Sequence, residues 1–140
     1  MSFKRSILRA LALAAIMTGV VACGRSKANS GEERQASIVL ETNEIWMGSF
    51  PAGSGRHTVV FPFRNAGDAD LELLDADTSC WCVSTDFPRK PIKPGRKGEI
   101  TVTVDVSDKK PGTFNHHVYF VETGSPSHIA LTIKGEITEK

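Results

Sequence analysis

The strongest constraint on the fold is a two-residue hydrophobic period that recurs along the chain. In residues 99–106 every even-numbered position holds Ile or Val, whereas the odd-numbered positions hold Glu, Thr or Asp. A less regular alternation runs through residues 57–63 and 129–137. Successive side chains of a β-strand point to opposite faces, so each run predicts a strand with one face in a core and one in water.

Turn-forming residues separate these runs. Pro94-Gly95 and Pro111-Gly112 supply the two residues favoured at the centre of a type II turn. Further strands are expected at residues 38–42, 71–75 and 113–122. No segment after Cys23 shows a helical period. Short strands at a spacing of roughly ten residues predict an all-β fold, a single antiparallel immunoglobulin-like β-sandwich of about seven strands.

The N-terminal segment has the features of a secretory signal. Three basic residues precede an apolar run over residues 10–22, and this run is too short to span a bilayer. The run ends in Val20-Val21-Ala22-Cys23-Gly24, which resembles the bacterial lipobox. We therefore expect residues 1–22 to be a cleaved lipoprotein signal peptide and Cys23 to carry the lipid. The alternatives are an ordinary secretory signal followed by an unrelated cysteine, or a buried helix.

The lipobox divides the chain into three parts and predicts its location. Residues 23–36 are small and polar, as in a flexible tether, and residues 37–140 form the expected sandwich domain. The protein would be anchored to the inner or outer membrane through Cys23 and face the periplasm or the cell surface. Of the three cysteines, Cys80 and Cys82 then remain as a pair in an oxidising compartment, where a disulfide is expected.

The charge balance argues against a nucleic-acid partner. The net charge is +1, but all 16 acidic residues follow the signal segment, which itself holds three of the 17 basic ones. Beyond residue 22 this leaves 14 basic residues and a net charge of −2. Nucleic-acid binding depends on neutralising phosphates with basic side chains, and the domain has no basic excess for it.

Several ordered motifs resemble one bacterial family. They are Phe61-Pro62-Phe63-Arg64-Asn65-Ala66-Gly67, Thr78-Ser79-Cys80-Trp81-Cys82, Pro91-Ile92-Lys93-Pro94-Gly95 and Gly98-Glu99-Ile100-Thr101-Val102. Over about 95 residues the chain resembles domain-of-unknown-function family 1573, whose pattern reads approximately F-x-F-x-N-x-G, S-C-G-C-T and I-x-P-G. The resemblance implies an envelope protein, often a lipoprotein, with an immunoglobulin-like fold akin to ASH and PapD-like sandwiches. The chain departs from the pattern at Trp81 and Val83, where the family usually has Gly and Thr.

The Cys80-Trp81-Cys82 segment is the main candidate for chemistry, and three interpretations stay open. The pair can be a structural disulfide that fixes a turn. It can also exchange with other thiols, because strained or exposed disulfides react more readily. Thirdly, the two thiolates can bind a soft metal such as copper or zinc together with His116 or His117. The two histidines are adjacent on an expected strand, so at most one of them can join such a site.

The remaining candidates concern partner binding. Trp81 either packs over the disulfide or is presented as an aromatic anchor, whereas Trp46 is expected to pack on the first strand. Arg89 and Lys90 belong to a basic loop that is either solvated surface or a second partner contact, for example with anionic headgroups or acidic glycans. We find no catalytic arrangement beyond the cysteine pair and expect no cofactor. The preferred hypothesis is a non-enzymatic, membrane-tethered module that binds a protein partner in the envelope; thiol exchange or metal binding is the alternative.

Overall fold

A computed structural model describes residues 33–124 and 128–140. The predicted signal peptide over residues 1–22 and the lipid-carrying Cys23 lie outside the described residues. Within them lie eight strands, β1 (Ile38–Leu40), β2 (Glu44–Pro51), β3 (Arg56–Asn65), β4 (Leu73–Thr78), β5 (Val83–Asp86), β6 (Lys97–Asp105), β7 (Gly112–Glu122) and β8 (Ile129–Thr138). The described residues contain no helix long and apolar enough to cross a membrane.

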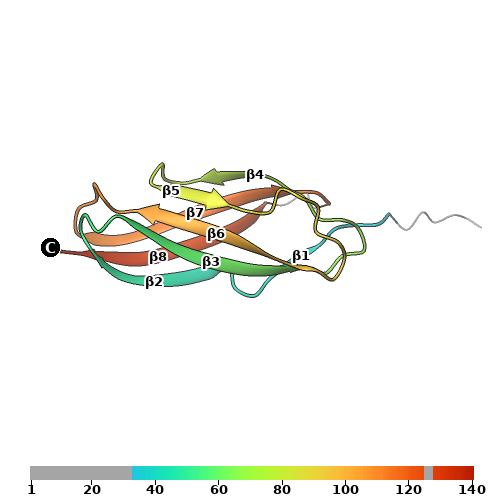
Figure 1. The fold of residues 1–140 in the computed structure, drawn as a ribbon, viewed down its shortest axis with the longest axis horizontal. Coiled ribbons are helices and arrows are strands. Elements are labelled where there is room, and N and C mark those ends of the chain that lie inside the picture. The colour runs from blue at the N-terminus through green and yellow to red at the C-terminus, as the bar shows by residue number, and fades with distance from the viewer. Residues whose placement is uncertain (1–32, 125–127) are drawn as a thin grey trace, which may run out of the picture. The chain divides into compact units, whose positions relative to one another are not determined.

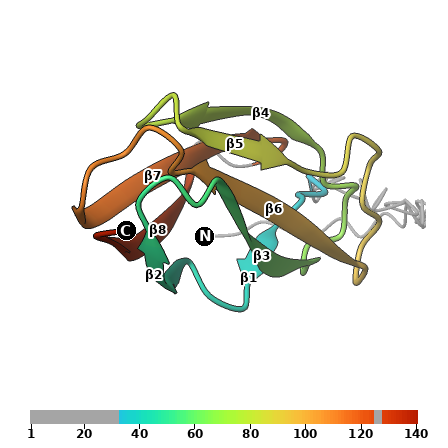
Figure 2. The same cartoon turned by 60° about the vertical axis from the view of Figure 1, so that its left-hand side comes forward.

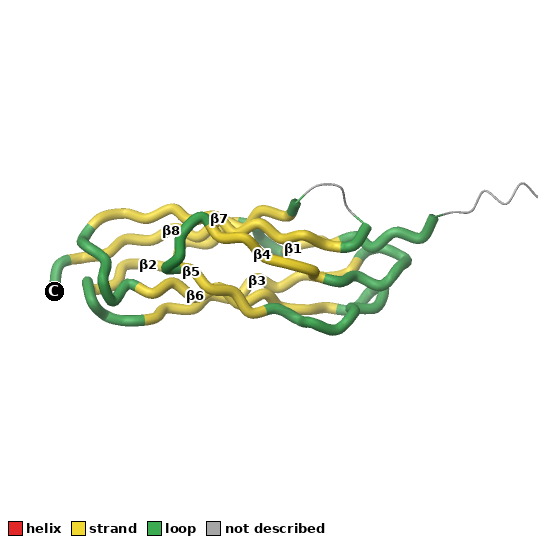
Figure 3. The backbone as a smooth tube through the Cα atoms, turned by 90° about the horizontal axis from the view of Figure 1, so that it is seen from above, coloured by secondary structure: helices red, strands yellow, loops and turns green. Residues whose placement is uncertain are grey.

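The strands form two four-stranded sheets, in the orders β1-β3-β6-β5 and β2-β8-β7-β4 (Figure 1). The strands run roughly along one axis of the domain, and the loops gather towards its ends (Figure 3). The all-β, immunoglobulin-like sandwich predicted from the sequence is confirmed. Strand β1 lies in one sheet and the next strand, β2, lies in the other. Together they correspond to the first strand of an immunoglobulin-like fold, divided here between the two sheets.

Two details differ from the prediction. The fold has eight strands instead of about seven, and β2 pairs with β8 in parallel, although the sandwich was expected to be antiparallel throughout. Strand β2 escaped prediction because Gly48, with φ of 103°, interrupts its alternation where the pairing register shifts between Trp46 and Ser49. Strand β5 has only four residues, and three of them are polar.

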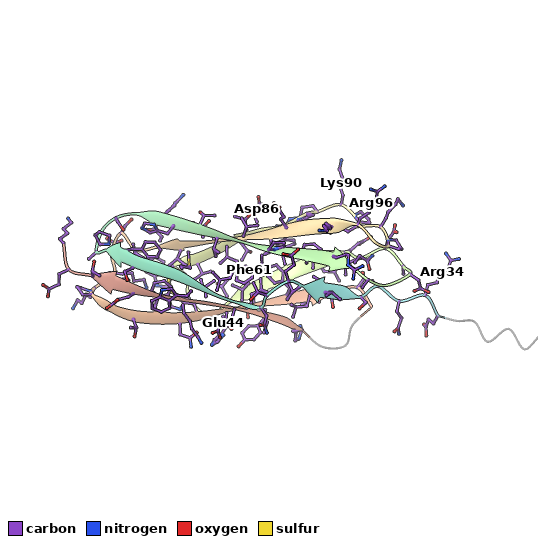
Figure 4. The ribbon with its side chains drawn as sticks, turned by 90° about the horizontal axis from the view of Figure 1, so that it is seen from below. Arg34, Glu44, Phe61, Asp86, Lys90 and Arg96 are labelled. Atoms are coloured by element: carbon purple, nitrogen blue, oxygen red, sulfur yellow. A yellow bond between two sulfur atoms is a disulfide. The ribbon has the colours of Figure 1, made fainter. Side chains whose placement is uncertain are left out.

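The core fills the space between the sheets with the residues that the alternation pointed inward. Figure 4 shows Phe61 between the two layers of strands. The largest fully buried apolar side chains are Phe61, Phe63, Leu71, Ile100, Val102, Val104, Val106, Val118, Phe120, Leu131 and Ile133. Apolar burial on this scale is the main stabilising contribution to such a domain.

The domain begins slightly before residue 37. Ala36 is buried against the core. The backbone N–H of Gln35 donates to Asp68 Oδ1 at 2.7 Å, and its carbonyl accepts the N–H of Asp68 at 3.0 Å. Gln35 and Ala36, the last two residues of the expected tether over residues 23–36, therefore pack against the domain.

Candidate functional site

The cysteine pair lies in the turn that connects β4 in one sheet to β5 in the other (Figure 2). The turn closes locally because the Cys80 carbonyl accepts the N–H of Val83 at 3.0 Å and the hydroxyl of Thr78 at 3.1 Å. The N–H of Cys82 points towards Cys80 Sγ at 3.3 Å. These bonds close the turn around the two sulfurs.

Hydrogen bonds hold the turn against both sheets. Ser79 and His117 of β7 exchange two bonds: the Ser79 N–H donates to the His117 carbonyl, and the His117 N–H donates to Ser79 Oγ, both at 2.9 Å. On the other side, the N–H of Asp105 at the end of β6 donates to the Cys82 carbonyl at 2.9 Å. The position of the turn is therefore fixed by the sandwich and not by the turn alone.

A disulfide joins Cys80 and Cys82, whose Cα atoms are 5.2 Å apart. Cys82 is buried in the core, whereas Cys80 is partly exposed. The two sulfurs therefore differ in access.

His116 completes a cluster with the two cysteines. Its side chain points between the sheets, its ring stacks on Phe114 with centroids 5.6 Å apart, and its Nε2 lies 3.6 Å from Cys82 Sγ. The ligand atoms of Cys80, Cys82 and His116 all lie within 4.8 Å of one another. In residues 33–124 and 128–140 this is the one group of three Cys, His or acidic side chains close enough to share a metal ion.

His117 takes no part in the cluster. Its Nδ1 lies 3.2 Å from Thr132 Oγ1, and its ring neighbours Tyr119 on the outer face of the sheet. Of the two histidines that the sequence left as alternatives, the structure places His116 at the cysteines and His117 on the opposite face, as expected for neighbours on a strand.

Lys109 is a member of the site that the sequence did not indicate. Its Nζ lies 3.6 Å from Cys80 Sγ and 5.1 Å from the centre of the Trp81 ring. It comes from the loop between β6 and β7, about 30 residues away in sequence, and a loop lysine carries no signal of such a contact. Burial lowers the pKa of the His116 imidazole, and the positive charges of Lys109 and His117 lower it further. A neutral imidazole, the metal-binding form, is thereby favoured.

Trp81 is presented to solvent by the turn. Its side chain is 82% exposed, so it does not cover the disulfide. Trp46 is 59% exposed on β2, and the expectation that it packs on the first strand is wrong. Trp46 lies at an exposed position of strand β2, whereas Trp81 lies in the turn between β4 and β5.

Arg89 and Lys90 are not brought together with Trp81. They follow the opposite end of β5 from the turn (Figure 1). Figure 4 shows Lys90, Arg96 and Arg34 towards the same end of the domain. The guanidinium of Arg89 lies over the Phe87 ring, 4.0 Å from its centre. The basic loop and the Trp81 turn are therefore separate surfaces.

Comparison with known proteins gives a family and a fold. The family described as "Protein of unknown function (DUF1573)" matches residues 38–137. A protein of unknown function from Porphyromonas gingivalis W83 has a similar structure, with 17% identity and a TM-score of 0.65 over 74% of this chain. The match covers 48% of that protein, so this chain spans about half of its length.

Two further structures share the architecture. The ASH/PapD-like domain 7 of human CEP192 has 7% identity and a TM-score of 0.60, over 74% of this chain and 86% of that one. The periplasmic chaperone SfaE has 9% identity and a TM-score of 0.53, over 73% of this chain and 58% of that one. At these identities the likeness shows the fold alone. Among curated proteins, none matches the sequence.

Proposed function

The chain belongs to the DUF1573 family, whose description assigns no activity, and from this premise we propose that it is a non-enzymatic protein-binding module. In this proposal the lipid on Cys23 tethers the domain to a membrane of the bacterial cell envelope. The sandwich then binds a protein of the same compartment through the Trp81 turn.

The observation that carries the proposal is the exposure of Trp81 on a turn fixed at several points. An indole that is 82% exposed in the free protein gains a large apolar contact when a partner covers it. The disulfide and the bonds of Ser79 and Cys82 restrict the turn before binding. Because less conformational entropy is then lost on association, the same contact gives a tighter complex.

Lys109 indicates the chemistry of the partner surface. Its ammonium lies 5.1 Å from the Trp81 ring centre, so the turn presents an aromatic side chain beside a positive charge. The complementary surface is an apolar pocket with an acidic group at its rim. Arg89 and Lys90 lie outside this contact and serve, in this proposal, as solvated surface.

The test uses a photo-crosslinking amino acid at position 81 of the full chain in living cells. The matched control carries the same amino acid at position 46, the other exposed tryptophan. We expect one discrete envelope protein to be crosslinked from position 81 and not from position 46. Trp81→Ala should weaken the isolated complex by about 2 kcal/mol, or roughly 30-fold in Kd. Identical crosslinking from both positions, or none from position 81, contradicts the proposal.

Thiol–disulfide exchange is the second candidate, and the position of Lys109 favours it. An ammonium 3.6 Å from Cys80 Sγ stabilises the thiolate of the more accessible cysteine. Equilibration of the full chain with glutathione buffers measures the reduction potential of the pair. A value between about −120 and −230 mV, the range of known exchangers, supports exchange, whereas a value below about −300 mV identifies a structural disulfide.

A further inference from the structure

We propose that reduction of the Cys80–Cys82 disulfide opens a binding site for one Cu(I) ion, with Cys80 Sγ, Cys82 Sγ and His116 Nε2 as its ligands. The proposal is independent of partner binding by Trp81, since it concerns the inner side of the same turn. The three donors come from two segments that are far apart in the sequence and that the fold brings together.

The spacing of the donor atoms suits a single small ion. Ligands bound to one metal at about 2.0–2.3 Å lie roughly 3.5–4 Å from each other in a trigonal arrangement. Cys82 Sγ and His116 Nε2 are already 3.6 Å apart, and all three donors lie within 4.8 Å. Once the sulfur–sulfur bond is broken, a small separation of the two sulfurs completes the triangle.

The donors are held by groups that do not depend on the disulfide. The turn keeps its bonds to His117 and Asp105 in the neighbouring strands. The His116 ring is stacked on Phe114 at an interplanar angle of 18°, which orients Nε2 towards Cys82. The site is therefore formed before the metal arrives, and binding requires little rearrangement.

The ligand set and the local charge favour Cu(I). Two thiolates and one imidazole are soft donors, which suit Cu(I) and Zn(II) better than hard cations. A structural zinc site normally needs four ligands, and the described residues offer three. Cu(I) with two thiolates carries one negative charge, which the ammonium of Lys109 at 3.6 Å from Cys80 Sγ balances. Zn(II) with two thiolates is neutral and leaves that ammonium unbalanced.

The chemistry balances with a dithiol as the reductant. One thiolate of the dithiol attacks a sulfur of the Cys80–Cys82 bond and forms a mixed disulfide. The second thiolate of the dithiol then displaces the protein sulfur. Two electrons have passed to the protein, two cysteine thiols have formed, and the dithiol has become a disulfide. Cu(I) then binds both sulfurs and the neutral imidazole, and two protons are released to solvent.

The test measures Cu(I) affinity on the full chain without oxygen, by competition with a chromophoric Cu(I) chelator. The reduced wild-type chain is compared with its oxidised form, with Cys80→Ser and with His116→Ala. His117→Ala is the matched control, because it removes the adjacent imidazole from the opposite face. Far-UV circular dichroism verifies that each variant is folded. X-ray absorption of the loaded wild-type chain counts the ligands without any substitution.

We expect one Cu(I) per reduced chain and a coordination shell of two sulfurs and one nitrogen. The oxidised chain and Cys80→Ser should bind at least 100-fold more weakly, and His116→Ala at least 10-fold more weakly, whereas His117→Ala should stay within about threefold. The proposal is overturned if reduced and oxidised chains bind equally, if His116→Ala and His117→Ala behave alike, or if absorption shows sulfur ligands only. Preference for Zn(II) over Cu(I) in the reduced chain also overturns it.

Discussion

Asn65 is a fully buried polar residue that joins two loops and the segment before β1 at one end of the sandwich. Its Nδ2 donates to the carbonyls of Ala69 and Ile92, both at 2.8 Å. Its Oδ1 accepts the N–H of Gly67 at 3.0 Å and that of Ser37 at 3.4 Å. Every hydrogen-bonding group of the side chain is therefore used, which makes burial of the amide favourable.

Replacing Asn65 should be costly for stability. Asn65→Ala leaves the Ala69 carbonyl and the N–H groups of Ser37 and Gly67 without this partner, and it removes one of the two donors to the buried Ile92 carbonyl. We therefore expect the free energy of unfolding to fall by about 3 kcal/mol. Urea unfolding of the full chain measures this change. Asn115→Ala, at an exposed position of β7, is the control and should change stability by less than about 0.5 kcal/mol. Equal effects of the two substitutions would show that the Asn65 network contributes nothing specific.

Glu122 is a second buried polar residue, and it lacks such a network. Its Oε2 has no hydrogen-bond partner among the described residues. Burial raises the pKa of this carboxyl from 4.5 to about 7. The folded protein therefore keeps the proton at pH values where the unfolded chain has lost it.

This difference predicts stability that decreases as the pH rises. The contribution of Glu122 is present in full below pH 4.5, is lost as the pH rises towards 7, and levels off above it. Between pH 8 and pH 5 the wild-type chain should gain roughly 2–3 kcal/mol relative to Glu122→Gln, which has no carboxyl to titrate. Urea unfolding of both proteins across this pH range measures the difference. Parallel pH profiles for the two proteins would contradict the assignment.

At the scale of elements, two glycines of the family-like motifs have packing roles. A Cβ on Gly67 would collide with the backbone of Gln35, and one on Gly98 would lie 2.5 Å from the Phe63 ring. Together with the buried Phe61 and Phe63 and the bonded Asn65, these contacts explain most of the F-x-F-x-N-x-G pattern through folding. In the Cys80-Trp81-Cys82 motif, packing accounts for the buried Cys82 but not for the exposed Trp81.

The turn also yields a prediction about the disulfide itself. The bond joins residues only two positions apart, so it closes a very short loop and restricts the unfolded chain little. Chain-entropy arguments give about 1.5 kcal/mol for a loop of this length, at the low end for disulfides. We expect the reduced chain to stay folded and to lose about that much stability in urea unfolding with and without reductant. Cys80→Ser, which removes the disulfide at the partly exposed cysteine, should match the reduced wild type; collapse of the fold on reduction would contradict this account.

At the scale of the whole molecule, the described chain enters the sandwich away from the Trp81 turn. Figure 4 shows Arg34 at the end of the domain where Lys90 and Arg96 project. Gln35 pairs with Asp68 at this end, and Asn65 bonds to Ile92 there. The turn lies beyond the opposite end of β5 (Figure 1). Within the described residues, Arg34 and the Trp81 turn therefore lie towards different ends of the sandwich.

The proposed anchor has its own prediction. Cys23→Ser removes the thiol that would carry the lipid, so the protein should move from the membrane fraction to the soluble fraction and lose incorporation of a labelled fatty acid. Two or more acyl chains hold a protein firmly, so the shift should be nearly complete. Cell fractionation with fatty-acid labelling measures both effects, and Cys80→Ser serves as the control that keeps them. Unchanged labelling of Cys23→Ser would eliminate the lipoprotein proposal.

The sequence determined the fold class because side-chain alternation is a local property of strands. Ile100, Val102 and Val104 share a buried face in the structure, as their spacing predicted. The same reasoning predicted that the side chains of His116 and His117 lie on opposite faces of their strand, since neighbouring residues of a strand point in opposite directions. The sequence did not predict strands β2 and β5. A bulge at Gly48 interrupts the alternation in β2, and β5 is a four-residue segment in which three residues are polar.

Only the tertiary structure decided the composition of the site. His116 and Lys109 lie close to the cysteines because of how the two sheets pack and where the loop between β6 and β7 lies. A local sequence pattern does not predict such long-range contacts. The exposure of Trp81 likewise follows from the bonds of its turn to β6 and β7. Local periodicity determines which face of a strand is buried. The pairing of distant segments determines which side chains meet, and the candidate site of this protein depends on such pairing.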